Sequence, residues 1–296
     1  MTSHKHRLFL ALIIALSIVV FGVLLFLAFP KVAVSEIEKD VMFTTTFTGP
    51  TLAYQLLKIK YSDTTAMVRH TMAHIFGETL YLRSGLDGFS VCDTDFNYGC
   101  YHGFLLRAVS ENGLEVITSL DDACFEADPD RPSTCQHGLG HGILEYLGQK
   151  NLTQALQICK TLREVEEYAG CTAGVFMDYN IFATRTEDGE YTVSSREIQK
   201  ESDLYAPCTD IPEEFQSSCY HELPQWWNTH FRMEFKRHGE YCEGIETASG
   251  KRACYFGVGG VIAGFLQYNR NSSVAACKEM PTENGVRTCI ARVARA

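Results

Sequence analysis

The chain has 296 residues, twelve cysteines and a formal net charge of −10. A negative chain without a block of Lys or Arg offers no electrostatic surface for nucleic acid or anionic lipid, so we expect neither as a partner. The hydrophobic content of 46% excludes a disordered protein, because it suffices for a packed core.

The first predicted element is a transmembrane helix over residues 8–29. This segment carries no charge, and at about 1.5 Å per residue it spans a ~30 Å hydrocarbon core. The stronger positive flank precedes it, which predicts a cytoplasmic stub over 1–7, a linker over 30–48 and an extracytoplasmic domain over 49–296. A cleavable signal peptide is the alternative. Under the first interpretation the membrane is a partner through residues 8–29, and under both the rest of the chain is exported.

The cysteines recur in six pairs along the exported part. Successive second cysteines are 35, 36, 48, 35 and 35 residues apart, and each first cysteine precedes its partner by 8 to 12 residues. Periods of this size indicate helical hairpins. One helix is expected to end at each first cysteine, and a second helix to begin at each second cysteine.

A seventh copy of the repeat precedes the first cysteine, with Leu57 and Val68 at the two cysteine positions. We number places along each second helix from its cysteine, or from Val68, as place zero. Place four is apolar in all seven copies, which predicts a core position. Its occupants are Met72, Phe104, Leu139, Val175, Leu223, Val258 and Val293.

This seventh copy also predicts the disulfide pairing. It has lost both cysteines together, whereas pairing between neighbouring hairpins would leave Cys92 and Cys289 unpaired at the ends of the array. An even number of exported cysteines indicates disulfides, and the absence of a CxxC spacing argues against a zinc finger or a thiol-redox centre. We therefore expect one disulfide inside each hairpin: Cys92–Cys100, Cys124–Cys135, Cys159–Cys171, Cys208–Cys219, Cys242–Cys254 and Cys277–Cys289.

The repeat predicts an all-α fold of seven hairpins of about 35 residues, arranged as a strongly curved solenoid or a closed α/α toroid. Recurrent glycine at place three indicates close approach of the second helices and favours strong curvature. The period resembles that of tetratricopeptide-type helical repeats, and the stapling resembles that of secreted, disulfide-bonded helical repeat proteins. The one irregular spacing comes from a polar insertion, Arg185 to Glu197, which we expect to be an exposed flap.

Histidines recur at fixed places of the second helices. Place two holds His70, His102, His137 and His221, and place six holds His74 and His141. Place ten of the latter two hairpins holds Glu78 and Glu145. Because residues four apart lie on one helix face, two such imidazoles can bind one ion. The pattern predicts a metal site made by these six histidines, with each glutamate as a ligand or a catalytic base.

Imidazole and carboxylate donors favour transition metals over calcium and magnesium. We expect zinc first, for its abundance, and iron or copper next. Two alternatives are structural histidines that cap helices or bind carbonyl oxygens, and a b-type haem held by two histidines. Asp178 and Glu222 are expected to orient an imidazole by hydrogen bonding.

Two functional hypotheses of different class follow. The first is a membrane-anchored, metal-binding ectodomain whose ion activates water for hydrolysis or binds oxygen. The second is a non-catalytic scaffold that binds another envelope protein on its concave surface. The sequence leaves open whether the protein is an enzyme.

Overall fold

The structure, a computed structural model, describes residues 36–163, 168, 170–185 and 191–295. Both the expected cytoplasmic stub, 1–7, and the expected transmembrane segment, 8–29, lie outside the described residues. Within the part of the chain that is described, no helix combines the length and the apolar character needed to cross a bilayer.

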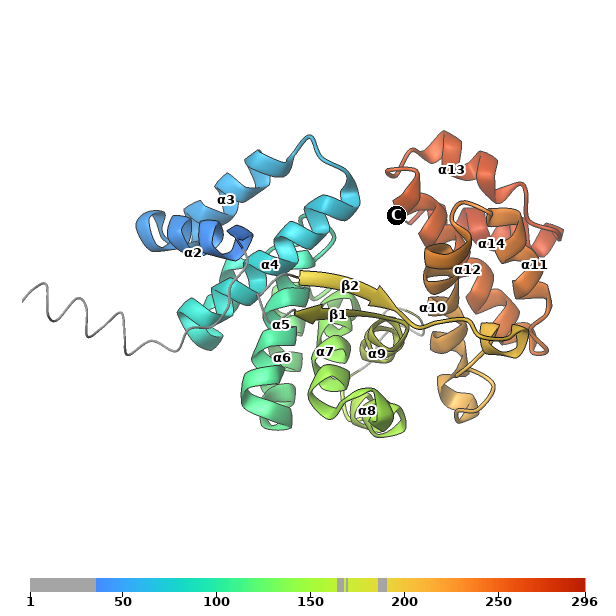
Figure 1. Cartoon of the computed structure of the whole chain (residues 1–296), viewed down its shortest axis with the longest axis horizontal. Helices are drawn as coiled ribbons and strands as arrows, with labels where there is room; N and C mark the ends of the chain where they lie inside the picture. The colour runs from blue at the N-terminus through green and yellow to red at the C-terminus, as the bar shows by residue number, and fades with distance from the viewer. Residues whose placement is uncertain (1–35, 164–167, 169, 186–190, 296) are drawn as a thin grey trace, which may run out of the picture.

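Helices dominate the described chain, as expected (Figure 1). The α-helices are α2 (Glu36–Thr48), α3 (Pro50–Tyr61), α4 (Ala66–Ser84), α5 (Gly99–Asn112), α6 (Ile117–Ala127), α7 (Pro132–Leu147), α8 (Leu152–Cys159), α9 (Cys171–Asn180), α10 (Glu213–Phe231), α11 (Phe235–Glu243), α12 (Ala248–Phe265), α13 (Arg270–Cys277) and α14 (Glu283–Val293). Short 3₁₀ segments are η1 (Gly85–Val91), η2 (Gly113–Val116), η3 (Gln149–Asn151) and η4 (Glu201–Leu204).

Local sequence explains where several helices begin. The side chains of Thr65, Thr247 and Thr282 each accept a hydrogen bond from the backbone N–H three residues later, at the starts of α4, α12 and α14. Such caps satisfy one of the N–H groups that a helix start leaves unpaired. Pro50 and Pro132 occupy the first turns of α3 and α7, where a missing N–H costs nothing.

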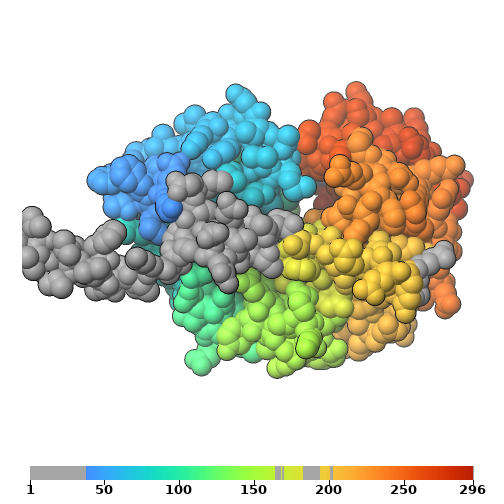
Figure 2. All heavy atoms as spheres, in the orientation of Figure 1, coloured from blue at the N-terminus to red at the C-terminus, as the bar shows by residue number. Residues whose placement is uncertain are grey.

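The second helices of the seven hairpins pack in chain order, each on the next: α4, α5, α7, α9, α10, α12 and α14. The other elements flank this row. In Figure 1 the chain runs from α3 and α4 through α5–α9 to α10–α14, and its C-terminus faces the α3–α4 hairpin. A hydrogen bond of 2.8 Å from the Ala66 N–H to the Gln267 side-chain oxygen joins α4 to the turn after α12. In the space-filling view the red C-terminal hairpins lie next to the cyan residues of that hairpin (Figure 2).

The core prediction for place four is confirmed, because all seven occupants are buried and five of them have no exposed surface. These five are Phe104, Leu139, Val175, Leu223 and Val258. A residue at this place of each second helix therefore fills the space between its own hairpin and the neighbouring ones.

All six predicted disulfides are present, one inside each hairpin. Their Cα–Cα distances run from 5.4 to 5.6 Å, the usual range for such bonds. No free cysteine occurs among the described residues. This complete pairing indicates folding in an oxidising environment.

The recurrent glycines bring helix backbones together, as expected. A Cβ atom at Gly103, Gly174 or Gly257 would overlap the carbonyl oxygen at place six or place two of the preceding second helix, that of His74, His137 or His221. Gly77 and Gly140 make the reciprocal approach, to the carbonyl oxygens of Cys100 and Cys171. The packing of α4 on α5, and of α7 on α9, thus depends on residues without side chains.

The insertion departs from the all-α fold that we expected. Together with the residues just before it, it forms an antiparallel pair of strands, β1 (Ile181–Arg185) and β2 (Tyr191–Ser195). Both segments are rich in β-branched and aromatic residues, which favour strands. Residues 186–190 of the insertion lie outside the described chain. After β2, the backbone is fixed on α10, where Trp226 donates its indole N–H to the Arg196 carbonyl oxygen at 2.7 Å.

The segment 30–48 was expected to be a linker, but its described part forms a helix, α2 (Glu36–Thr48). This helix packs on α3 and α4, with Val41 buried. The sequence gives only a weak indication of this helix, because the apolar residues of α2 do not line one face of it. The helical domain therefore begins before residue 49.

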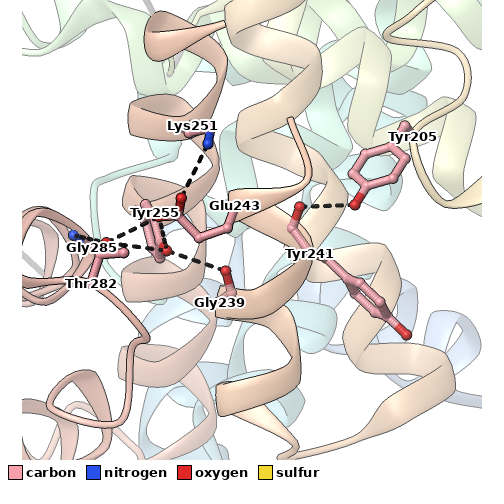
Figure 3. A network of polar contacts seen from close by, with 8 residues as sticks. All are labelled: Tyr205, Gly239, Tyr241, Glu243, Lys251, Tyr255, Thr282 and Gly285. Atoms are coloured by element: carbon pink, nitrogen blue, oxygen red, sulfur yellow. Dashed lines mark hydrogen bonds and ion pairs between the residues drawn. The ribbon is translucent and has the colours of Figure 1, made fainter. Parts of the chain in front are cut away.

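A polar network fastens the last hairpins to one another (Figure 3). The Glu243 carboxylate, at the end of α11, accepts hydrogen bonds from Tyr255 of α12 at 2.6 Å and from Thr282 at 3.0 Å. Lys251 forms an ion pair with the same carboxylate at 3.1 Å. Tyr255 and the other hydrogen-bond donors hold the pKa of Glu243 below its ordinary value. One acid thus links α11, α12 and the start of α14.

Candidate metal centre

The candidate site lies where α4, α5 and α7 pack side by side. Helix α4 contributes His70 and His74, one turn apart, and α5 contributes His102. Each of these three residues offers one ring nitrogen, and the three nitrogen atoms all lie within 4.8 Å of one another. A single ion can bridge donors at such separations after small side-chain rotations, because metal–nitrogen bonds are about 2.0–2.1 Å long.

Two further histidines extend this group. His137 and His141 of α7 have ring centroids 4.9 Å apart. The His102 ring lies 5.3 Å from that of His137 and 6.1 Å from that of His141, and the His74 ring lies 6.3 Å from that of His141. Five of the six predicted histidines therefore form one group, which we call the histidine cluster: His70, His74, His102, His137 and His141.

Backbone carbonyls fix the rings of two cluster members. His70 Nδ1 lies 2.9 Å from the Phe96 carbonyl oxygen, and His102 Nε2 lies 2.9 Å from that of Thr134. A carbonyl oxygen only accepts, so these two nitrogens must carry the hydrogen. In a neutral imidazole the opposite nitrogen then holds a lone pair. This is the arrangement that metal-binding histidines commonly have, with one N–H bonded to a carbonyl or a carboxylate.

Burial keeps four of the cluster imidazoles neutral, those of His70, His102, His137 and His141. Burial, with the neighbouring His74 as the next cause, lowers the pKa of His70 to about 4. The pKa values of His137 and His141 fall to about 3 for the same main reason, burial, with His141 and His74 respectively as the next cause. The pKa of His102 is also well below its ordinary value. At neutral pH these rings therefore have the unprotonated nitrogen that a metal requires.

His74 has an unusual environment. Its Nδ1 is buried and makes no hydrogen bond within the described residues, while Glu78 Oε1 lies 4.0 Å away. Glu78 is itself 2% exposed. Burying a polar atom without a partner costs free energy, and a bound cation near this nitrogen would remove that cost.

A carboxylate stands beside the second histidine pair. Asp178 of α9 places Oδ1 at 3.6 Å from His141 Nδ1, which puts the carboxylate beside an imidazole but beyond hydrogen-bond distance, so its orienting role stays a prediction. The Gln149 side chain donates to Asp178 Oδ2 at 3.3 Å. Burial raises the pKa of Asp178 to about 7. Met177, the preceding residue, brings Sδ to 3.2 Å from His137 Nε2.

His221 lies apart from the cluster. Among the described residues, the aromatic rings next to it are Tyr168 at 5.7 Å and Phe256 at 5.9 Å. Its Nδ1 is 2.9 Å from Glu222 Oε1, the partner expected from the sequence. The α9 helix, with Ala173 at place two, stands between α7 and α10 and separates His221 from His137.

The two predicted glutamates have different environments. Glu78 is buried next to His74, whereas Glu145 is exposed near the end of α7. Each residue turns a helix by about 100°, so place ten lies about 80° from place two around the helix axis. The carboxylate next to His141 comes from α9 instead. A catalytic role for either glutamate stays a prediction.

Sequence reasoning missed the contacts that Phe96, Thr134 and Met177 make with the rings. Phe96 and Thr134 act through backbone atoms, which leave no signal in residue type. His238, by contrast, lies outside the cluster: it is fully buried between Trp227 and Phe235 and belongs to the core.

No family of known proteins, no curated protein and no solved structure matches this chain.

Proposed function

We propose that this protein is a membrane-anchored, extracytoplasmic helical-repeat protein that binds a transition metal through His70, His74 and His102. The observation that carries the proposal is the approach of three ring nitrogens, from two consecutive hairpins, to within 4.8 Å of one another. The lowered pKa values of His70 and His102 and the carbonyl partners of both rings support it.

The donor set favours zinc. Three imidazoles suit zinc, copper, iron or nickel, and they suit calcium and magnesium poorly because those ions prefer oxygen ligands. Zinc is compatible with a tetrahedral site of three histidines and one water, and such a site lowers the pKa of the bound water. Whether the ion serves catalysis or structure is then decided by access of a substrate to that water.

The proposed placement in the cell rests on two features. The uncharged segment 8–29 ends six residues before α2 begins. Exposed apolar side chains also follow it, with Phe43 and Phe47 on α2 and Leu52 and Ile59 on α3. We infer that this face lies near the membrane surface and that the hairpins form a strongly curved array in the oxidising compartment.

The test is elemental analysis of the full chain, purified in mild detergent from an oxidising compartment without chelator. We expect zinc in the unmutated protein and a lower zinc content in a His70→Ala/His102→Ala variant, which lacks two of the three ligands. The matched control is His221→Ala, which changes the same repeat place outside the cluster and should keep the metal. Unmutated protein without stoichiometric transition metal would refute the proposal.

A non-catalytic scaffold is the second candidate, and one observation favours it. His102 Nε2 binds the Thr134 carbonyl oxygen and so ties α5 to α7 without any ion. In that case the histidines hold the hairpins together, and the array binds another envelope protein. A His102→Ala variant would then lose the same free energy of unfolding with and without chelator, whereas metal binding predicts a larger loss without chelator.

A further inference from the structure

We propose a second metal position beside the first, held by His137 and His141 of α7 and Asp178 of α9, so that the histidine cluster forms a two-metal centre. This inference rests on the proposed function, because it extends the same cluster. It assigns a role to the two histidines and the buried carboxylate that the first position does not use.

Helix geometry brings two of the three donors together. His137 and His141 are one turn apart on α7, and their ring centroids lie 4.9 Å from each other. Two imidazoles at i and i+4 can bind one ion from a single helix face. The His137 ring is also held in place, because its Nε2 lies 3.2 Å from Met177 Sδ on the neighbouring helix.

Asp178 supplies the third donor. Its Oδ1 lies 3.6 Å from His141 Nδ1, and its side chain is 8% exposed. Within the described chain, this carboxylate lies beside the His141 ring and accepts a hydrogen bond from the amide of Gln149. A buried carboxylate without a cation is costly, and a divalent ion between Asp178 and the two imidazoles would compensate it.

The two positions are neighbours. His102, a donor of the first position, has its ring 5.3 Å from His137 and 6.1 Å from His141. His74 approaches His141 with 6.3 Å between ring centroids. Ions held by these two groups of side chains would therefore share one buried environment, as paired ions do in two-metal enzymes that activate water.

The donor sets of the two positions differ, which gives them different preferences. Three imidazoles hold the first ion, whereas two imidazoles and one carboxylate would hold the second. The latter set is found with zinc and with iron(II), and it leaves coordination positions open for water or substrate. Like the first position, the second thus leaves room for an exchangeable ligand.

The experiment measures zinc stoichiometry and affinity by titrating the full chain, stripped of metal, with zinc chloride. We expect two zinc ions per unmutated chain, one in His137→Ala/His141→Ala and one in His70→Ala/His102→Ala. Asp178→Asn keeps the shape of the side chain and should weaken the second ion at least tenfold while leaving the first unchanged. His221→Ala should still bind two. Circular dichroism and disulfide mapping verify folding of each variant.

The possible failures are distinguishable. One ion in the unmutated chain, lost in His70→Ala/His102→Ala and kept in His137→Ala/His141→Ala, would overturn the second position and leave the proposed function intact. Loss of all zinc in both double variants would show one shared site and also overturn it. No zinc in the unmutated chain would overturn both proposals. If the double variants do not fold, unchanged affinity in Asp178→Asn refutes the second position.

Discussion

The α-carbon of Gly103 lies against the carbonyl oxygen of His74, so closely that a Cβ atom there would overlap it. Gly103 follows His102 directly, and His74 is itself a donor of the proposed site. The contact that lets α5 approach α4 is therefore the contact that brings the His102 ring to the other two. Packing of the hairpins and assembly of the metal centre depend on the same atoms.

Gly103→Ala should therefore destabilise the protein and reduce its metal content. The added methyl group meets backbone rather than a flexible side chain, so we expect a loss of about 3 kcal/mol in the free energy of unfolding. Guanidinium denaturation with the disulfides intact measures it. Gly264→Ala is the control, because a Cβ at Gly264 in α12 meets nothing within 4 Å. That change should stabilise the helix slightly, and equal effects of the two changes would contradict the packing argument.

The metal-free protein should lose stability as the pH falls from 7 toward 4. The folded pKa values of His70, about 4, and of His137 and His141, about 3, lie below the unfolded value of 6.5. Between these values the unfolded chain binds more protons, so stability rises with pH, by about 1.4 kcal/mol per pH unit for each proton. Asp178 works the opposite way, because its pKa is raised to about 7, and it offsets one histidine.

Chemical denaturation at several pH values, with chelator present, measures this dependence. The free energy of unfolding of a His141→Gln variant should fall less between pH 7 and pH 4, because the variant lacks one of the groups that take up a proton when the chain unfolds. A free energy of unfolding that stays constant between pH 7 and pH 4 would contradict the burial of neutral imidazoles in the cluster.

Glu243→Gln should weaken the C-terminal hairpins without affecting metal. The change removes the negative charge that accepts hydrogen bonds from Tyr255 and Thr282 and that pairs with Lys251. The Glu243 side chain is 33% exposed, so solvent screens part of the effect, and we expect a loss of about 1 kcal/mol. A double-mutant cycle with Tyr255→Phe isolates the hydrogen bond between the two residues. Additive effects of the two changes would show that this bond contributes nothing.

The full chain should stay in the membrane fraction after alkaline carbonate extraction. Protease added from the extracytoplasmic side should reach the helical domain, and a tag placed before residue 1 should be protected. These results follow if residues 8–29 form a retained helix with the N-terminus in the cytoplasm. Release of a protein that lacks the first thirty or so residues would instead support the cleavable signal.

Local rules were enough to predict the disulfides and the place-four core. Cys124 and Cys135 pair inside one hairpin because a helical hairpin brings its own two ends together, whatever its neighbours do. Place four is buried in every copy because an apolar residue recurs on the same face of each second helix. These features depend on distances along the chain that are shorter than one repeat.

Which histidines meet could not be predicted from the repeat, because it depends on how consecutive hairpins pack on one another. His137 and His221 share place two, yet Ala173 occupies that place on the helix between them. The sequence predicted that Asp178 would lie beside an imidazole, but it did not say which one. Only the packing of α9 on α7 shows that the imidazole is that of His141. Curvature and crossing angle belong to the whole array and leave no local pattern.

The six disulfides also decide how the chain behaves when it is cut. Each bond closes a loop within one hairpin, and none connects two hairpins. A protease that cleaves inside a loop, such as the one from Cys124 to Cys135, leaves both fragments covalently joined until a reductant is added. Cleavage between loops leaves only noncovalent packing to hold the fragments. The disulfides therefore keep the chain covalently joined after cleavage inside a closed loop, but not after cleavage between two loops.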